Sequence, residues 1–204
     1  MPEIGYWHPQ LVHFAVVLGI VGALFRLISL TGKFSWTGSA ARAILIPAGL
    51  VGWLTARSGH DAHGPVERIP GAVNAVVEHE EWGDRARNAL MAVAALELIG
   101  LALGQRKVVG AIRLASGLAG VGAMFALYEA AEHGGELVYE YAGGPGIRSG
   151  DSTDVTRLLV AGLYSRAMAD RASGDKAGAA RLFEELGHRM PNDQGSRLLV
   201  IELT

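Results

Sequence analysis

Apolar residues gather in four long segments in the first two-thirds of the chain, and these predict four transmembrane helices. The segments cover Leu11–Leu30, Ala41–Ala56, Ala89–Gly104 and Val108–Ala131. The first is about 20 residues long, which is enough to span a bilayer. The second is shorter and contains Pro47, which a membrane helix tolerates when neighbouring helices cover the carbonyl that it frees. Small residues recur through the fourth segment and favour close helix packing.

Charged residues interrupt three of these apolar segments. They are Arg26, Glu97 and Arg113. An ionisable group inside a membrane costs free energy unless it is paired or reaches the surface. We therefore expect an Arg–Glu–Arg tether between helices, with snorkelling arginines, in preference to a proton path.

The residues that follow the fourth apolar segment, which ends at Ala131, are no longer uniformly apolar. A Gly134-Gly135 pair predicts a break in the helix, and the LVYEY sequence at residues 137–141 is typical of a strand. Glycines then predict a turn. Ionisable groups gather just before the break, at Glu129, Glu132 and His133, so we interpret this stretch as part of a functional site.

The rest of the chain has an ordinary polar composition and predicts a soluble helical tail. We divide the chain into a membrane domain at residues 1–146, a linker at 147–152 and the tail at 153–204. Asp151 or Ser152 is expected to cap a helix over Thr153–Ser173. A second helix is expected over Lys176–Met190, and a further one can begin at Gln194. The predicted fold is thus all-α: a four-helix transmembrane bundle plus a small soluble α-helical hairpin tail.

The spacing of residues in the tail resembles one tetratricopeptide unit. Small, aromatic and proline residues fall at that repeat's usual positions at Ala167, Ala179, Phe183 and Pro191, although Asp170 stands where an aromatic residue is usual. A single hairpin of this kind does not bury its apolar face alone. The face is therefore expected to pack on its own bundle, on a second copy of the chain in a homo-oligomer, or on a protein partner.

Composition agrees with a membrane protein and narrows its chemistry. Charged residues make up 19% of the chain, against about 25% in soluble domains. The net charge of −2 and the lack of a basic stripe argue against a nucleic-acid partner. Cysteine is absent, which excludes disulfides, thiolate catalysis and covalently attached haem c.

The short loops between the apolar segments predict the orientation of the chain. The first loop, Thr31–Arg42, carries Lys33 and Arg42, and Arg106 and Lys107 lie in the third loop, with no acidic residue in either. By the positive-inside rule both loops face the cytoplasm. Both termini then face outward, which in a bacterial inner membrane is the periplasm.

Most histidines fall on the predicted outer side. Each predicted helix contributes at least one of His8, His13, His60, His63, His79 and His133. Imidazole is the commonest metal ligand. Without thiolates, the ligands suit haem b, or iron, copper, zinc or manganese without haem. The alternative is that these histidines lie at solvated helix ends and bind no cofactor.

Depth in the membrane favours one pair for haem b. His13 and His133 both lie near an apolar boundary, and the first and fourth helices of a bundle are neighbours. A non-haem metal would draw on a second, more exposed set and on the acids beside His133, namely His60, His63, His79, Glu129 and Glu132. We interpret His8 as a structural residue and His188 as a surface residue.

Three motifs resemble a bacterial four-span family that is known as a domain of unknown function. HPQLVHF at residues 8–14 is similar to its HPxxVHF start, and HGGELVYEYAGGPG at 133–146 to its HxGGxLVYxxGxG end. VEHEEWG at 77–83 is similar to its third-helix histidine region. The chain departs from the family at Ala15, where proline is usual, and at Tyr141, where histidine is common.

This resemblance covers roughly residues 6–146 and implies a four-helix integral membrane protein. Members of the family stand in some cases beside cytochrome modules, so the resemblance implies haem binding. The matching positions are His8, His13, His79, His133, Gly134, Gly135 and Tyr139.

We therefore expect a cofactor-binding membrane protein that transfers electrons within a respiratory or photosynthetic complex. The alternative is a non-catalytic subunit that its tail docks to a larger membrane complex. The chain has no nucleophile–base arrangement, phosphate loop or nucleotide motif that would indicate a hydrolase or a transferase.

Overall fold

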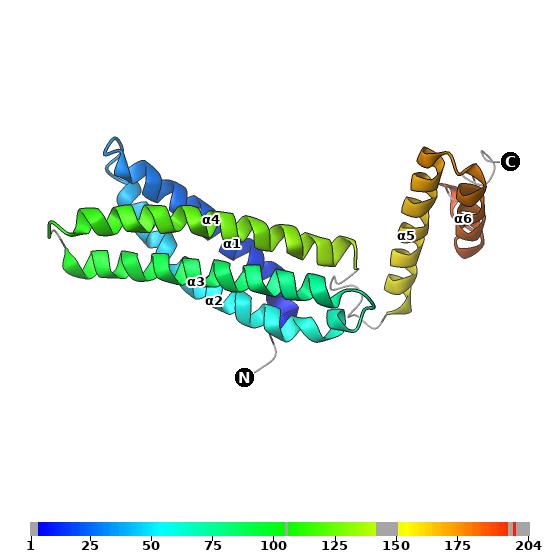
Figure 1. Cartoon of the computed structure of the whole chain (residues 1–204), viewed down its shortest axis with the longest axis horizontal. Helices are drawn as coiled ribbons and strands as arrows, with labels where there is room; N and C mark the ends of the chain where they lie inside the picture. Colours follow the sequence, from blue (N-terminus) through cyan, green and yellow to red (C-terminus); the bar gives the residue numbers. More distant parts are fainter. Residues whose placement is uncertain (1–3, 105, 142–150, 196–197, 199–204) are drawn as a thin grey trace. The chain divides into compact units, whose positions relative to one another are not determined.

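The computed structural model describes residues 4–104, 106–141, 151–195 and 198, and the regular structure of these residues is helical throughout. The all-α prediction is therefore confirmed. The chain divides into two compact units, residues 1–143 and 144–204, which we call the bundle and the tail. Figure 1 shows the long helices of the bundle running side by side.

The bundle consists of α1 (His8–Leu30), α2 (Thr37–Glu67), α3 (Val73–Leu103) and α4 (Val109–Tyr139), preceded by the 3-10 turn η1 (Gly5–Trp7). Each helix packs on the next, and α1 also packs on α4. Within the described part of the chain, these are the helices long and apolar enough to cross a membrane. The prediction of four such helices is confirmed.

Small residues face the interior of the bundle and large apolar residues face outward. A Cβ on Gly49 would stand 2.6 Å from the Ala94 Cβ, and one on Gly120 would stand 3.1 Å from the Ala23 Cβ. Leu118, by contrast, is 65% exposed. Helices that pack closely through small residues and expose leucine side chains are typical of membrane proteins, whose outer surface contacts lipid.

The predicted break at Gly134-Gly135 is wrong, because α4 continues through both glycines to Tyr139. The LVYEY stretch is therefore not a strand. Leu137 is buried against Val66, Val76 and neighbouring residues at the ends of α2 and α3. This packing on adjacent helices outweighs the local strand preference of the sequence.

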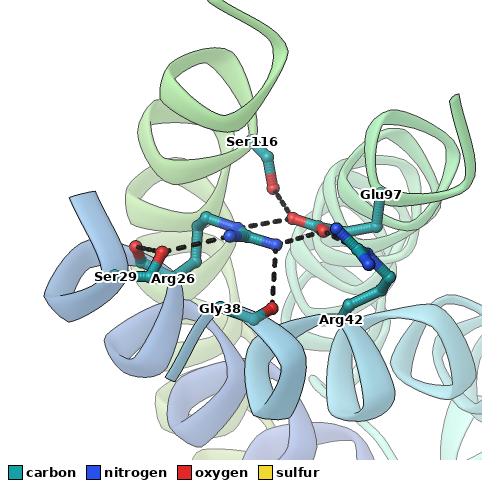
Figure 2. A network of polar contacts seen from close by, with 6 residues as sticks. All are labelled: Arg26, Ser29, Gly38, Arg42, Glu97 and Ser116. Carbon is teal, nitrogen blue, oxygen red and sulfur yellow. Dashed lines mark hydrogen bonds and ion pairs between the residues drawn. The ribbon is translucent and has the colours of Figure 1, made fainter. Parts of the chain in front are cut away.

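A polar network joins the helices at depth in the bundle (Figure 2). The Arg26 Nε donates to Glu97 Oε1 at 2.7 Å, and the Ser116 hydroxyl donates to the same oxygen at 2.5 Å. Arg26 and Glu97 are 1% and 3% exposed. The second arginine of the tether is Arg42, whose Nε lies 3.9 Å from Glu97 Oε2, and not the predicted Arg113. Arg113 lies three residues before Ser116, nearer the start of α4, and is exposed.

The tail consists of α5 (Ser152–Ser173) and α6 (Lys176–Arg189). The Asp151 carboxylate caps α5 by accepting a hydrogen bond from the Thr153 N–H, as predicted. Gly174 ends α5 with a φ of +90°, a conformation that favours glycine. A buried cluster joins the two helices through Ala167, Ala179, Phe183 and Leu186.

Some sequence predictions fall on residues that are not described. Residues 147–150 of the predicted linker lie outside the described residues. The same is true of most of the helix expected from Gln194, of which Gln194, Gly195 and Leu198 are described as helical.

Candidate metal centre

A cavity of about 320 Å³ opens among the four helices α1, α2, α3 and α4 at the end of the bundle where α2 turns into α3. Its lining includes His8 at the start of α1, His60 and His63 in the last turns of α2, and His79 and Glu80 in the first turns of α3. Consecutive antiparallel helices bring these chain-distant segments together. We call this region the histidine end.

Glu80 lies between two imidazole rings in this cavity. Its Oε1 is 3.6 Å from His60 Nδ1, and its Oε2 is 3.8 Å from His63 Nδ1. One ligand atom from each residue lies within 4.8 Å of the other two. Within the described part of the chain, this set is the group able to hold a metal ion.

These distances suit a shared cation better than direct hydrogen bonds. Hydrogen-bonded N···O pairs lie about 2.7–3.2 Å apart. Two ligands of one tetrahedral ion, each about 2.1 Å from it, lie about 3.4 Å apart. The separations of 3.6 and 3.8 Å around Glu80 are close to that value.

The local sequence explains why these ligands converge. His60 and His63 are three residues apart in α2, so they share one face of the helix. The α2–α3 turn is centred near Pro70, and His60 and Glu80 are each ten residues from it. Residues equidistant from a turn between antiparallel helices lie opposite each other.

The ligand types narrow the choice of ion. Imidazole nitrogens favour zinc, copper or iron over magnesium and calcium, which prefer all-oxygen sites. Three protein ligands leave a coordination position for water or another molecule. His60 is 73% exposed and His63 is 15% exposed, so an ion here would be reached from water.

A second pair of histidines lies in the same cavity. The rings of His8 and His79 have centroids 6.2 Å apart and planes at 78°. His79 Nδ1 donates to the Ala130 carbonyl oxygen at 3.0 Å. His8 Nδ1 lies 3.2 Å from the Thr55 carbonyl oxygen and 3.0 Å from Ser58 Oγ. Because a carbonyl oxygen only accepts, Nδ1 carries the proton in both rings.

Two glycines make room for these rings. A Cβ on Gly134 would stand 2.9 Å from His79 Cε1, and one on Gly59 would stand 3.0 Å from His8 Cε1. Imidazoles held at Nδ1 by a backbone carbonyl are oriented as metal-ligating histidines are. The glycines therefore allow α4 and α2 to approach the two rings closely.

The predicted haem pair lies elsewhere. His13 is exposed, and its Nδ1 lies 2.5 Å from the Pro9 carbonyl oxygen of its own helix. His133 is on α4 at 22% exposure. The cavity described above is lined by neither residue.

Carboxylates surround His133. Its ring nitrogens lie 4.0 Å from Glu78, 3.9 Å from Glu129 and 3.6 Å from Glu136. Glu132 is exposed. The structure thus groups His60, His63 and His79 in the cavity and leaves Glu129 beside His133.

Sequence reasoning missed the roles of two residues. Glu80 is not singled out by the sequence analysis, although its symmetry with His60 about Pro70 marks it as the opposite residue. His8 was interpreted as structural. Its place beside His79 depends on how the first turn of α1 meets α2, and no spacing in the sequence indicates that.

The chain matches no family model, no curated protein and no solved structure. The resemblance of residues 6–146 to a four-span family therefore stays a prediction. The candidate site is defined by the geometry of the chain's own residues.

Proposed function

We propose that this protein is a membrane protein that binds a transition-metal ion at the histidine end of its bundle. His60, His63 and Glu80 are the ligands. The observation that carries the proposal is the convergence of their ligand atoms within 4.8 Å, at separations longer than hydrogen bonds. Zinc, copper and iron are the ions whose preferences fit this set.

If the bound ion is iron or copper, we propose that the protein transfers electrons. Such an ion supplies a one-electron couple. His79 lines the same cavity, and the open side of the cavity gives a redox partner access from water. The half-buried site thus supports electron exchange at the membrane surface, whereas zinc at the same ligands would support a structural role.

Haem b is a second candidate, and His8 and His79 are the residues that favour it. Their rings lie close together and each is oriented through Nδ1. His8 and His79 would hold the haem iron through their Nε2 atoms, and the haem would supply a one-electron couple. This pair replaces His13 and His133 as our first choice, because it lines a cavity.

Metal analysis of the full chain in neutral detergent tests both candidates. We expect one equivalent of zinc or copper to bind, and His63→Ala or Glu80→Gln to weaken binding by at least about tenfold. His188→Ala is the matched control, because that histidine lies in the tail and is exposed. Equal affinity in all variants would overturn the metal site.

An absorption spectrum of the same samples separates haem from metal. Haem between His8 and His79 predicts a Soret band that is lost in His79→Ala and kept in His63→Ala. A band lost instead in His13→Ala and His133→Ala would restore the original pair. Absence of haem and of stoichiometric metal would overturn both candidates.

The tail supports a docking role beside metal binding. Helix α5 exposes apolar side chains on one face, at Val155, Leu158 and Leu159. We propose that this face contacts a protein partner or a second copy of the chain. Truncation after Asp151 should remove a co-purifying partner or a dimer while the bundle still inserts. Unchanged composition of the purified complex would contradict the docking role.

The basic loops support an orientation. We propose a bacterial inner-membrane protein with both termini in the periplasm, because Lys33, Arg106 and Lys107 gather at one end of the bundle. Reporter fusions at Lys33 and at the C-terminus test this. A cytoplasmic signal from the C-terminal fusion would contradict it.

A further inference from the structure

A second cavity, of about 280 Å³, lies at the opposite end of the bundle, which we call the arginine end. Its lining includes Arg26 from α1, Arg42 from α2 and Arg113 from α4. The hydroxyl-bearing Ser35 and Ser39 also line it. Guanidinium and hydroxyl groups around one hollow are the donors that bind oxyanions.

The charges of this cavity are only partly balanced by the protein. Glu97 is hydrogen-bonded to Arg26, as the dashed lines of Figure 2 show. Arg42 donates no hydrogen bond to any described residue, and its Nε is buried without a hydrogen-bond partner there. Arg113 forms no ion pair with the described residues. Two guanidinium groups therefore remain in excess of the one carboxylate.

The backbone adds to this excess of positive potential. Helix α2 begins at Thr37, beside the cavity, and Gly38 and Ser39 of its first turn line the wall. That helix has no side-chain cap and no acidic residue in its first turn. The positive end of its dipole is thus left for an external anion.

The surroundings identify the kind of anion. Phe34, which lines the cavity, is 54% exposed, and nearby Trp36 is 58% exposed. Aromatic residues at the end of an apolar span are typical of the headgroup level of a bilayer. At that level, the abundant oxyanions are lipid phosphates.

We propose that the arginine end binds the phosphate of an anionic phospholipid headgroup. Arg42 and Arg113 are the principal donors, with help from Ser39 and the first turn of α2. The bidentate geometry of guanidinium groups suits phosphate oxygens. Basic pockets between membrane helices bind anionic headgroups in the same way.

Native mass spectrometry of the detergent-purified full chain tests this proposal. The probes are phosphatidylglycerol, phosphatidylcholine and, separately, inorganic phosphate. We expect selective retention of phosphatidylglycerol, weakened about fivefold in Arg113→Gln and further in the Arg42→Gln/Arg113→Gln double variant. Lys107→Gln is the control, because Lys107 is a basic residue of the α3–α4 loop that does not line the cavity.

Each outcome bears on the proposal. Loss of selectivity in the arginine variants but not in Lys107→Gln supports it. Equal retention of both lipids by the wild type, or unchanged retention in Arg113→Gln, overturns it. Binding of inorganic phosphate without lipid retention overturns the lipid assignment and indicates a soluble anion. Arg113 is exposed and forms no ion pair with the described residues, so its variant keeps the test valid if the double variant misfolds.

Discussion

The two ends of the bundle both hold ionisable side chains, but they hold them differently. At the arginine end, Glu97 is almost fully buried and accepts hydrogen bonds from Arg26 and Ser116. At the histidine end, Glu80 is 44% exposed and lies 3.6 and 3.8 Å from two imidazole nitrogens. A buried pair such as Arg26 and Glu97 holds helices together, whereas charged groups set apart around a cavity, such as Glu80 at one end and Arg42 and Arg113 at the other, leave room for a ligand.

Breaking the buried pair should have the largest effect. Glu97→Gln leaves the Arg26 guanidinium buried without its counter-charge, which costs about 3–5 kcal/mol. We expect a large fall in the thermal unfolding temperature of the full chain in detergent. Glu132→Gln, at an exposed position, is the matched control and should change little.

A double variant sharpens this test. Arg26→Met with Glu97→Leu replaces both charges by apolar groups, and such replacements are often neutral or stabilising. We expect the double variant to be more stable than Glu97→Gln alone. If Glu97→Gln unfolds at the wild-type temperature, the pair does not hold the helices together.

Metal binding should give the next largest effect, and only at the histidine end. At free zinc one hundred times the dissociation constant, a bound ion stabilises the folded state by about 2.7 kcal/mol. We expect a rise in unfolding temperature that a chelator reverses and that Glu80→Gln abolishes. Acidification should weaken it, because protons compete for the imidazole nitrogens. A zinc effect of equal size in Glu80→Gln would place the ion elsewhere.

Alanine substitutions at two adjacent glycines of α4 should have smaller effects on stability, and the two can be compared directly. A Cβ at Gly135 meets nothing within 4 Å, so Gly135→Ala should stabilise the helix by about 0.5–1 kcal/mol. A Cβ at Gly134 would stand 2.9 Å from His79 Cε1. Gly134→Ala should therefore give no such gain and should disturb the cavity. Thermal unfolding and zinc titration measure both, and equal gains would show that His79 moves aside freely.

The smallest effect is expected at Asp151 in the tail. Its carboxylate is exposed, whereas that of Glu97 is buried. The hydrogen bond from the Thr153 N–H lowers the pKa of Asp151 below its usual value. The Asp151 carboxylate therefore stabilises the start of α5 fully at a pH above the pKa that Asp151 has in the unfolded chain. This stabilisation is lost as the pH falls through the lowered pKa of Asp151 in the folded chain. Hydrogen exchange at the Thr153 and Asp154 amides should speed up in Asp151→Ala at neutral pH. Unchanged exchange would contradict the capping role.

The sequence predicted the long helices because their apolar segments are nearly unbroken. Its boundary was short for α2, since that helix continues into the polar stretch of residues 57–67, which carries no apolar signal. The helix end predicted at Gly134 was wrong because burial of Leu137 depends on the neighbouring helices. Local propensity contains no information about that contact.

The candidate site was only partly predictable for the same reason. His60 and His63 share a helix face, so spacing alone indicated them. Glu80 required the position of the α2–α3 turn, and His8 required the packing of α1 on α2. In the tether, the sequence indicated which arginines lie in apolar segments but not that Arg42, near the start of α2, reaches Glu97.

Helices α2, α3 and α4 are each 31 residues long. At 1.5 Å per residue they measure about 46 Å, whereas the hydrocarbon core of a bilayer is about 30 Å thick. If the span starts at the aromatic residues of the arginine end, about three turns of each helix project beyond the lipid at the other end. The ligands of the histidine end belong to those turns. If the proposed ion binds there, insertion and metal loading are separate events, and a water-soluble chelator should remove the ion while the protein stays in the membrane.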